Sequence, residues 1–184
     1  MELSKKNMWN AAGKAGLALG AVSSVYLFAG QFLSGDLQPA VLWQQIVAFA
    51  LWGVKFAGCI WLMKFFMTKF AAENEGTDNK AVFRMGMMTS FLSAVMFSAI
   101  FLANMLYISA DHYETVYQTA IQQMSSTLDS NSLSMLEKVI ANLPQISFFY
   151  NLIYCFLFGT VLSAILSRNI PAKDPFADYK PDEQ

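Results

Sequence analysis

The sequence predicts an all-α membrane protein with four transmembrane helices, and its composition and the spacing of its apolar residues carry that prediction. The 184 residues are 55% hydrophobic and only 14% charged, whereas a typical soluble domain carries about 25% charged residues. The apolar residues gather in four runs, each near the roughly 20 residues that a helix needs to cross a bilayer. Strands of a membrane barrel would be short alternating segments, and these runs do not alternate.

The four predicted spans cover residues from about 15 to 33, 41 to 63, 85 to 108 and 146 to 166, within one domain formed by residues 1–168. A signal peptide is the alternative interpretation of the first run, because Lys5 and Lys6 precede it. Cleavage requires a small residue three positions before the cut. A cut after Ala29 or Gly30 would place bulky Leu27 or Phe28 there, so we expect this segment to remain in the protein.

The connections between the spans differ in length and character. Residues 34–40 form a short turn with Gly35, Asp36 and Pro39, and residues 71–80 form a polar loop. The long segment 109–145 predicts two short amphipathic external helices, since apolar residues recur there every three or four positions. These positions are Tyr113, Val116, Tyr117, Ala120, Ile121 and Met124, then Leu133, Leu136, Val139, Ile140 and Leu143.

Asn131 is the expected N-cap of the second short helix, and Pro144 ends that helix. The two helices either lie on the outer leaflet or cap the bundle. Their role is either to cover the span ends or to provide a platform that docks a partner or binds lipid. Residues 169–184 contain Pro171, Pro175 and Pro181 among alternating charges, which predicts a disordered cytoplasmic tail.

The distribution of basic residues predicts the orientation of the spans. Lys55 lies inside the second span and Lys138 in the external segment, while the other ten Lys and Arg residues share one side. Both termini and the 71–80 loop are therefore expected in the cytoplasm, in a multi-pass inner-membrane protein. The ten residues are Lys5, Lys6, Lys14, Lys64, Lys69, Lys80, Arg84, Arg168, Lys173 and Lys180.

Composition excludes several classes of function. The formal net charge of −1 argues against a nucleic-acid partner. One histidine, His112, and two cysteines, Cys59 and Cys155, are too few for a histidine, cysteine–zinc or iron–sulfur site. Asp111 and His112 are capable of acid–base chemistry, but polar residues are expected at a helix end. Without a nucleophile or a phosphate loop we expect no cofactor, no metal and no catalytic residue, and therefore no enzyme.

Small residues four positions apart mark candidate helix-packing faces. Such stripes allow helix backbones to approach closely in lipid. They are interpreted as packing within the chain, or as one face for a partner protein or a second copy. The candidate packing residues are Gly16 and Gly20 in the first span, Gly86, Ser90 and Ala94 in the third, and Gly159 in the fourth.

Lys55 is the one charged residue inside a span. It lies nine residues from Lys64, hence about 13 Å into the membrane, and a charge there is a functional candidate. Counting to equal depth from Lys14, Arg84 and Arg168 gives a hydroxyl layer without a carboxylate, formed by Ser23, Ser24, Ser93, Thr160 and Ser163. This layer is a candidate anion or lipid site. A tilted span that places Lys55 at the interface is the inert alternative.

The same counting places Cys59 and Cys155 about 12 Å apart in depth. A disulfide allows a Cα separation of at most about 7 Å, so two free thiols are predicted.

Two segments resemble a known family. Phe83-Arg84-Met85-Gly86 opens the third span, and the run from Gly159 to Arg168 closes the fourth with small residues before a basic one. Together with four helices and the long external segment, they make the chain similar to a domain-of-unknown-function family of small bacterial inner-membrane proteins of Gram-negative species. The resemblance implies no catalytic residues. It also implies association with polyprenyl-phosphate glycosyltransferases and an accessory role in the envelope.

The predicted function is accordingly a non-catalytic accessory or scaffold subunit, with membrane lipids and a membrane protein or a second copy as partners. The alternative is a small carrier or lipid-handling protein that uses the Lys55 layer. A cavity that reaches Lys55 favours this alternative, whereas a solid bundle with an exposed small-residue face favours the scaffold.

Overall fold

The structure is a computed structural model that describes residues 5–34, 42–74, 77–125 and 127–170. Every regular element in these ranges is helical, which confirms the predicted all-α fold class. Four of the helices are long and apolar enough to cross a membrane, over Lys5–Gln31, Gln45–Glu73, Asn79–Ile108 and Leu143–Arg168. The predicted turn with Gly35, Asp36 and Pro39 and all but the first two residues of the predicted tail lie outside the described residues.

The four long helices extend beyond the apolar runs that predicted them. They are α1 (Lys5–Ser34), α2 (Leu42–Glu73), α3 (Asn79–Ala103) and α6 (Leu143–Arg168). Helix α1 begins at Lys5, about ten residues before the predicted start, and α2 continues about ten residues past Met63, since no glycine or proline interrupts the sequence between Met63 and Gly76. The predicted 71–80 loop is therefore shorter. Helix α3 already begins at Asn79, where the Asp78 carboxylate accepts a hydrogen bond of 2.7 Å from the Ala81 N–H.

The third span ends in a π-helix, η1 (Asn104–Ile108), instead of continuing as a regular helix. Asn104 is completely buried at its start. The backbone N–H of Ser109 donates to the Asn104 carbonyl oxygen at 2.8 Å, and the Ser109 hydroxyl donates to Asn104 Oδ1 at 3.2 Å. A π-helix of one turn is a local widening that is frequent at functional sites, and the apolar pattern of the sequence did not predict it.

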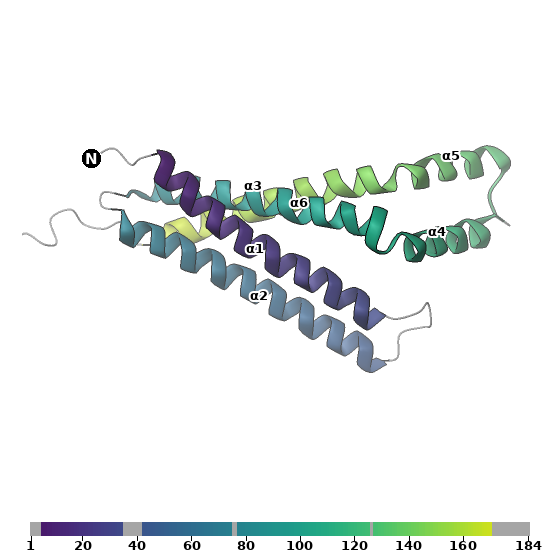
Figure 1. Cartoon of the computed structure of the whole chain (residues 1–184), viewed down its shortest axis with the longest axis horizontal. Coiled ribbons are helices and arrows are strands. Elements are labelled where there is room, and N and C mark those ends of the chain that lie inside the picture. Colours follow the sequence, from purple (N-terminus) through teal and green to yellow (C-terminus); the bar gives the residue numbers. More distant parts are fainter. Residues whose placement is uncertain (1–4, 35–41, 75–76, 126, 171–184) are drawn as a thin grey trace, which may run out of the picture.

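Two short helices, α4 (Ala110–Met124) and α5 (Ser130–Ala141), connect α3 to α6. They contact each other and run on from α3 and α6, so they form a hairpin that projects past the ends of α1 and α2 (Figure 1). The hairpin thus lengthens the bundle and does not fold back over the span ends. Neither helix holds a fully buried residue, and most of the predicted apolar positions, such as Val116 and Leu136, are half-buried.

The predicted N-cap of α5 is wrong by two residues. The cap is Asp129, whose carboxylate accepts a hydrogen bond of 3.2 Å from the backbone N–H of Ser132. Hydrogen bonds from Ser132 lower the pKa of the Asp129 carboxyl group. Several consecutive residues here have capping side chains, and the helix begins at the acidic one. Asn131 consequently lies inside the first turn.

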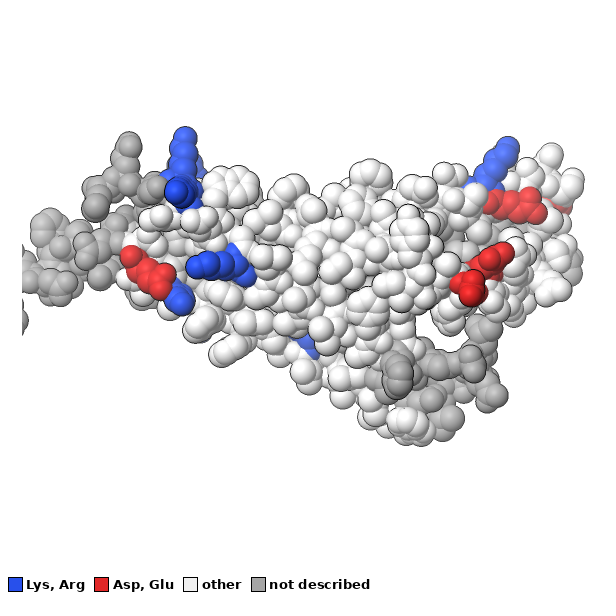
Figure 2. Space-filling model, in the orientation of Figure 1, with Lys and Arg blue, Asp and Glu red and all other residues white. Residues whose placement is uncertain are grey.

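Charge divides the bundle into two ends separated by a broad, almost uncharged band (Figure 2). We call one of them the basic end, after Lys14 and Lys69, which line one pocket there, and after Arg84 and Arg168 near the adjoining ends of α3 and α6. The other is the hairpin end, after α4 and α5. The buried core gathers near the basic end and includes Met63, Met67, Phe70, Val82, Met85 and Leu166. Toward the hairpin end, α1 and α2 diverge from α3 and α6 (Figure 1).

The small residues of the stripes are packed between helices of the same chain. Helix α3 lies between α1 and α6, which it contacts extensively, whereas α2 contacts α3 and α6 only slightly. Gly86 faces Ser163, and Gly159 faces Ser90 in turn, because α3 and α6 are antiparallel. A Cβ atom added at Gly159 would lie 2.6 Å from Ser90 Cβ, which is too close for two carbon atoms.

The α1–α3 contact is similarly close. A Cβ atom added at Gly16 would lie 2.8 Å from Leu92 Cβ, and one added at Gly20 would lie 2.7 Å from Met96 Sδ. Ala94 on α3 is buried as well. All six predicted packing residues therefore lie in contacts or buried positions within the chain.

Candidate functional site

The ammonium group of Lys55 lies against aromatic rings. Its Nζ atom is 4.7 Å from the ring centroid of Tyr26 on α1 and 5.2 Å from that of Phe97 on α3. Both distances are within the range of cation–π attraction, which partly offsets the loss of water around a desolvated ammonium. The ion pair found among the described residues joins Lys69 to Glu73, so within this part of the chain no carboxylate neutralises Lys55.

Lys55 borders two cavities. The first, the wedge cavity, has a volume of about 310 Å³ and lies on the side of Lys55 toward the hairpin end. The second, the central cavity, has a volume of about 170 Å³ and lies among α1, α2, α3 and α6. A single cationic group thus stands at the junction of both spaces. The wedge cavity is lined by Tyr26, Leu27, Gly30, Gln31, Lys55, Phe97, His112 and Tyr113.

The wedge cavity carries polar groups at its hairpin side. Gln31 Nε2 donates a hydrogen bond of 3.2 Å to the Tyr113 hydroxyl, which connects α1 to α4. His112 packs edge-on against Tyr113, with 5.8 Å between ring centroids. These groups can hydrogen-bond a polar ligand whose charge is compensated by Lys55.

The central cavity is walled by aromatic rings where α2 and α6 make few contacts. Phe56 of α2 meets Phe158 of α6 at 5.5 Å between centroids, and the ladder continues to Trp52 on α2 and to Tyr154 on α6. All four rings are partly exposed, so this wall faces the lipid side of the bundle. The remaining lining is mostly apolar and includes Leu19, Met63 and Leu162. Such a cavity suits an apolar chain.

The predicted hydroxyl layer does not assemble around Lys55. Of its members only Ser23 lines the central cavity, where its Oγ atom lies 4.0 Å from Cys59 Sγ. The other four hydroxyl residues do not line either cavity. Ser24, Thr160 and Ser163 donate to carbonyl oxygens of their own helices, and Ser93 lies at the α1–α3 contact beside Gly16. The aromatic partners Tyr26 and Phe97 take the place of the expected hydroxyls.

The predicted depth difference between the cysteines is also wrong. Cys59 and Cys155 both line the central cavity. Each also lies eight positions before a residue that faces Gly86, Met67 on α2 and Ser163 on α6, so the two cysteines lie at a similar level in the bundle. Both thiols are free, as predicted. In the described part of the chain, no three His, Cys, Asp or Glu side chains come together as a metal site would require.

Comparison with known proteins defines the family. No curated protein and no solved structure gives a significant match. Residues 14–168, from Lys14 near the start of α1 to the last residue of α6, match the family described as "Protein of unknown function (DUF4199)". Because this match covers most of the 184 residues, the chain belongs to the DUF4199 family.

Proposed function

We propose that this protein binds an anionic membrane lipid through Lys55, which makes it a lipid-handling protein. The observation that carries the proposal is an ammonium group without a carboxylate partner among the described residues, at the junction of two cavities. A lysine in the middle of a span costs at least about 2.5 kcal/mol on insertion scales. An anionic headgroup beside Nζ would offset that cost.

The two cavities suggest how such a ligand lies. A phosphate headgroup fits the wedge cavity, where Gln31, His112 and Tyr113 supply hydrogen-bonding groups near Lys55. An apolar chain fits the central cavity and reaches the bilayer between Phe56 and Phe158. Polyprenyl phosphates and ordinary anionic phospholipids share this chemistry, a phosphate joined to hydrocarbon.

A scaffold or accessory subunit of an envelope glycosyltransferase system is the second candidate. It rests on the family resemblance alone and stays a prediction. A scaffold that associates through the predicted small-residue stripes needs those stripes on an outer face, and their glycines, Gly16, Gly20, Gly86 and Gly159, all face neighbours within the chain. This packing favours the lipid-handling function.

The experiment that tests the proposal compares Lys55→Met with the wild type by native mass spectrometry of bound lipids and by thermal melting. Methionine keeps the length of the side chain and removes its charge. We expect Lys55→Met to lose most bound phosphatidylglycerol or polyprenyl phosphate, and Lys55→Arg to retain it.

The matched control is Lys64→Met, an equal change of charge on the same helix, at an exposed residue that borders neither cavity. This variant should bind as the wild type does. Unchanged lipid binding in Lys55→Met, with an equal or higher melting temperature, would contradict the proposal and show that Lys55 has no role in lipid binding.

We also propose that the protein lies in the bacterial inner membrane with the basic end in the cytoplasm. Support comes from the ten basic residues assigned to one side by the sequence. A cytoplasm-active reporter fused after Lys173 should be active, and the same reporter inserted after Ser125, between α4 and α5, should be silent. An active reporter in the hairpin with a silent tail would reverse the orientation.

A further inference from the structure

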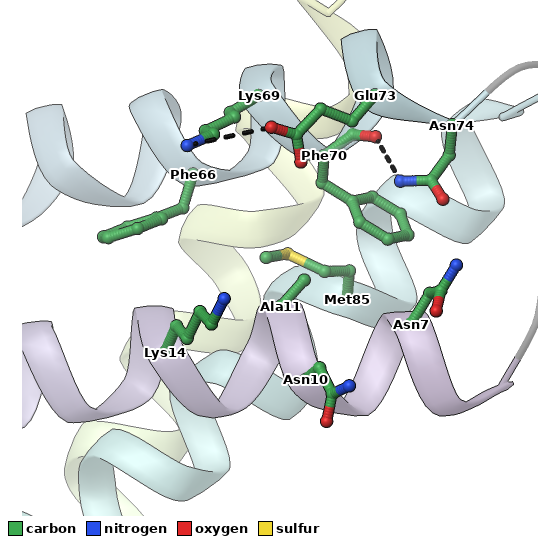
Figure 3. A pocket seen from close by; sticks show the side chains of 10 residues that line it. All are labelled: Asn7, Asn10, Ala11, Lys14, Phe66, Lys69, Phe70, Glu73, Asn74 and Met85. Atoms are coloured by element: carbon green, nitrogen blue, oxygen red, sulfur yellow. Dashed lines mark hydrogen bonds and ion pairs between the residues drawn. The ribbon is translucent and has the colours of Figure 1, made fainter.

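A third cavity lies at the basic end, between α1 and α2, at the opposite end of the bundle from the wedge cavity. Its volume is about 360 Å³, and its polar lining consists of Asn7, Asn10, Lys14, Lys69, Glu73 and Asn74. Figure 3 shows Lys14 extending from α1 toward α2, where Lys69 and Glu73 lie side by side. We call it the basic pocket.

Helical periodicity places these residues together. Asn7, Asn10 and Lys14 follow one another at spacings of three and four on α1, and Lys69 and Glu73 are four apart on α2. Residues at these spacings share one face of a helix. The two polar faces meet because the helices pack against each other in this region. The sequence pattern alone did not predict a site at these two lysines.

The charge of the basic pocket is unbalanced in favour of an anion. Lys69 Nζ lies 3.7 Å from Glu73 Oε1 in an exposed ion pair, and such pairs are held weakly. No carboxylate of the described residues pairs with Lys14. Two ammonium groups against one carboxylate leave one net positive charge in the lining.

The floor of the basic pocket is apolar. Phe70 and Met85 are buried beneath the polar rim, and Phe66 forms part of the wall. A charged rim above a hydrocarbon floor matches a ligand that has a phosphate and an apolar part. Lysine is a common phosphate ligand that acts as a point charge, and amide groups like that of Asn10 hydrogen-bond phosphate or glycerol oxygens.

We propose that the basic pocket is a second anion site, which binds a phosphate ester through Lys14 and Lys69. The ester is the headgroup of an anionic phospholipid in the leaflet at the basic end, or a free phosphate ester from solution. The site is independent of Lys55, since the two sets of lining residues share no member.

The test uses nanodiscs of phosphatidylglycerol diluted into phosphatidylcholine, with bound lipid counted by native mass spectrometry after release into detergent. Lys14 and Lys69 would each make a charge-assisted contact with the phosphate inside the basic pocket, which a lysine outside the pocket does not make. Lys14→Gln and Lys69→Gln are therefore each expected to weaken phosphatidylglycerol binding about fivefold, which corresponds to about 1 kcal/mol. Glu73→Gln is expected to strengthen it about twofold, because the competing carboxylate is gone.

Lys64→Gln is the matched control, an equal loss of charge on the same helix outside the basic pocket, and it should leave binding unchanged. The series is repeated in the Lys55→Met background, so that the failure of one site is distinguished from the failure of the other. A parallel titration with glycerol 1-phosphate in detergent separates the two sources. If this ester stabilises the wild-type protein but not Lys14→Gln, a free phosphate ester is a ligand of the basic pocket. If phosphatidylglycerol binds and the ester does not, the ligand is the lipid headgroup.

Equal binding in the wild type, Lys14→Gln and Lys69→Gln would overturn the proposal. An equal loss in Lys64→Gln would overturn it too, because general surface charge would then be responsible.

Discussion

Replacement of Gly159 by alanine is expected to lower the melting temperature of the protein. The added Cβ atom would lie 2.6 Å from Ser90 Cβ and 3.5 Å from Ser90 Cα. These atoms belong to or adjoin the backbone of α3, so no side-chain rotation relieves the overlap and the helices must separate. Overpacking of this kind costs about 1–3 kcal/mol. The higher helix propensity of alanine offsets about 1 kcal/mol of that cost.

Gly58→Ala is the matched control, because no other atom of the described part of the chain lies within 4 Å of a Cβ atom added there. It should leave the melting temperature unchanged or raise it. The reciprocal variant, Gly159→Ser with Ser90→Gly, exchanges the two partners and is expected to recover most of the lost stability, since it restores one small and one hydroxyl residue. Equal melting of Gly159→Ala and Gly58→Ala would contradict the close approach of α3 and α6.

This close approach has a functional consequence. Helices α1, α3 and α6 form a frame held by glycine and serine contacts, while α2 joins it chiefly through α1 and through the core near the basic end. Lys55 is on the more weakly attached part of α2, beside both cavities. A helix with few contacts to its neighbours is able to move aside for a lipid at low cost.

The sequence predicted the four spans and the spacing of the small residues, because both depend on the local pattern of the chain. The hydroxyl layer does not form around Lys55, because its prediction depended on how the different helices are aligned along the bundle axis. The count assumed that Lys64 marks the same level as Lys14. In the structure, Lys14 shares the basic pocket with Lys69, five residues further along α2, which corresponds to about 7.5 Å.

The consequence is a shift of the layer by about one helical turn toward the hairpin end. On α3 the residue predicted at the depth of Lys55 is Ser93, whereas Phe97 contacts Lys55. On α1 the predicted residues are Ser23 and Ser24, whereas Tyr26 is the contact. The shift arises because α1 and α2 pack with Lys14 near Lys69 and not near Lys64. The local sequence shows which segments are apolar but not how far the helices are displaced along one another when they pack.

The same displacement explains the cysteines. Met67 Cε lies 3.1 Å from a Cβ atom added at Gly86, which also faces Ser163, so Met67 and Ser163 share a level. Helices α2 and α6 run in the same direction, and each cysteine precedes its reference residue by eight positions. Cys59 and Cys155 therefore lie at a similar level, and both line the central cavity.

Replacement of Asn104 by leucine is expected to raise the melting temperature. Asn104 is completely buried, and its Nδ2 atom has no hydrogen-bond partner among the described residues. A buried donor left unpaired costs about 1–3 kcal/mol, and the hydrocarbon around a span offers no water to replace the missing acceptor. Leucine is of similar size and removes this cost, while the hydrogen bond that it loses, from the Ser109 hydroxyl to Asn104 Oδ1, is long at 3.2 Å and only partly buried.

Asn151→Leu is the matched control for Asn104→Leu. The Nδ2 atom of Asn151 donates to the Ser147 carbonyl oxygen at 2.9 Å, so its amide is already compensated and the gain should be smaller. Ser98→Ala removes Ser98 Oγ, a second buried polar atom without a partner among the described residues, and should also raise the melting temperature. A lower melting temperature in Asn104→Leu would mean that the amide has an acceptor in the folded protein, and would contradict the expectation.

Lipid binding by Asn104→Leu tests whether the unpaired Asn104 amide contributes to the lipid site. Asn104 begins the π-helix that joins α3 to α4, and α4 carries His112 and Tyr113 into the wedge cavity. If the π-helix positions these side chains, the more stable variant should bind less phosphatidylglycerol than the wild type, since proteins retain destabilising local features mainly where function requires them. Greater stability with undiminished binding would assign Asn104 no part in the site. Because leucine changes neither the charge nor any residue that lines the cavities, only a rearranged π-helix explains a loss of lipid.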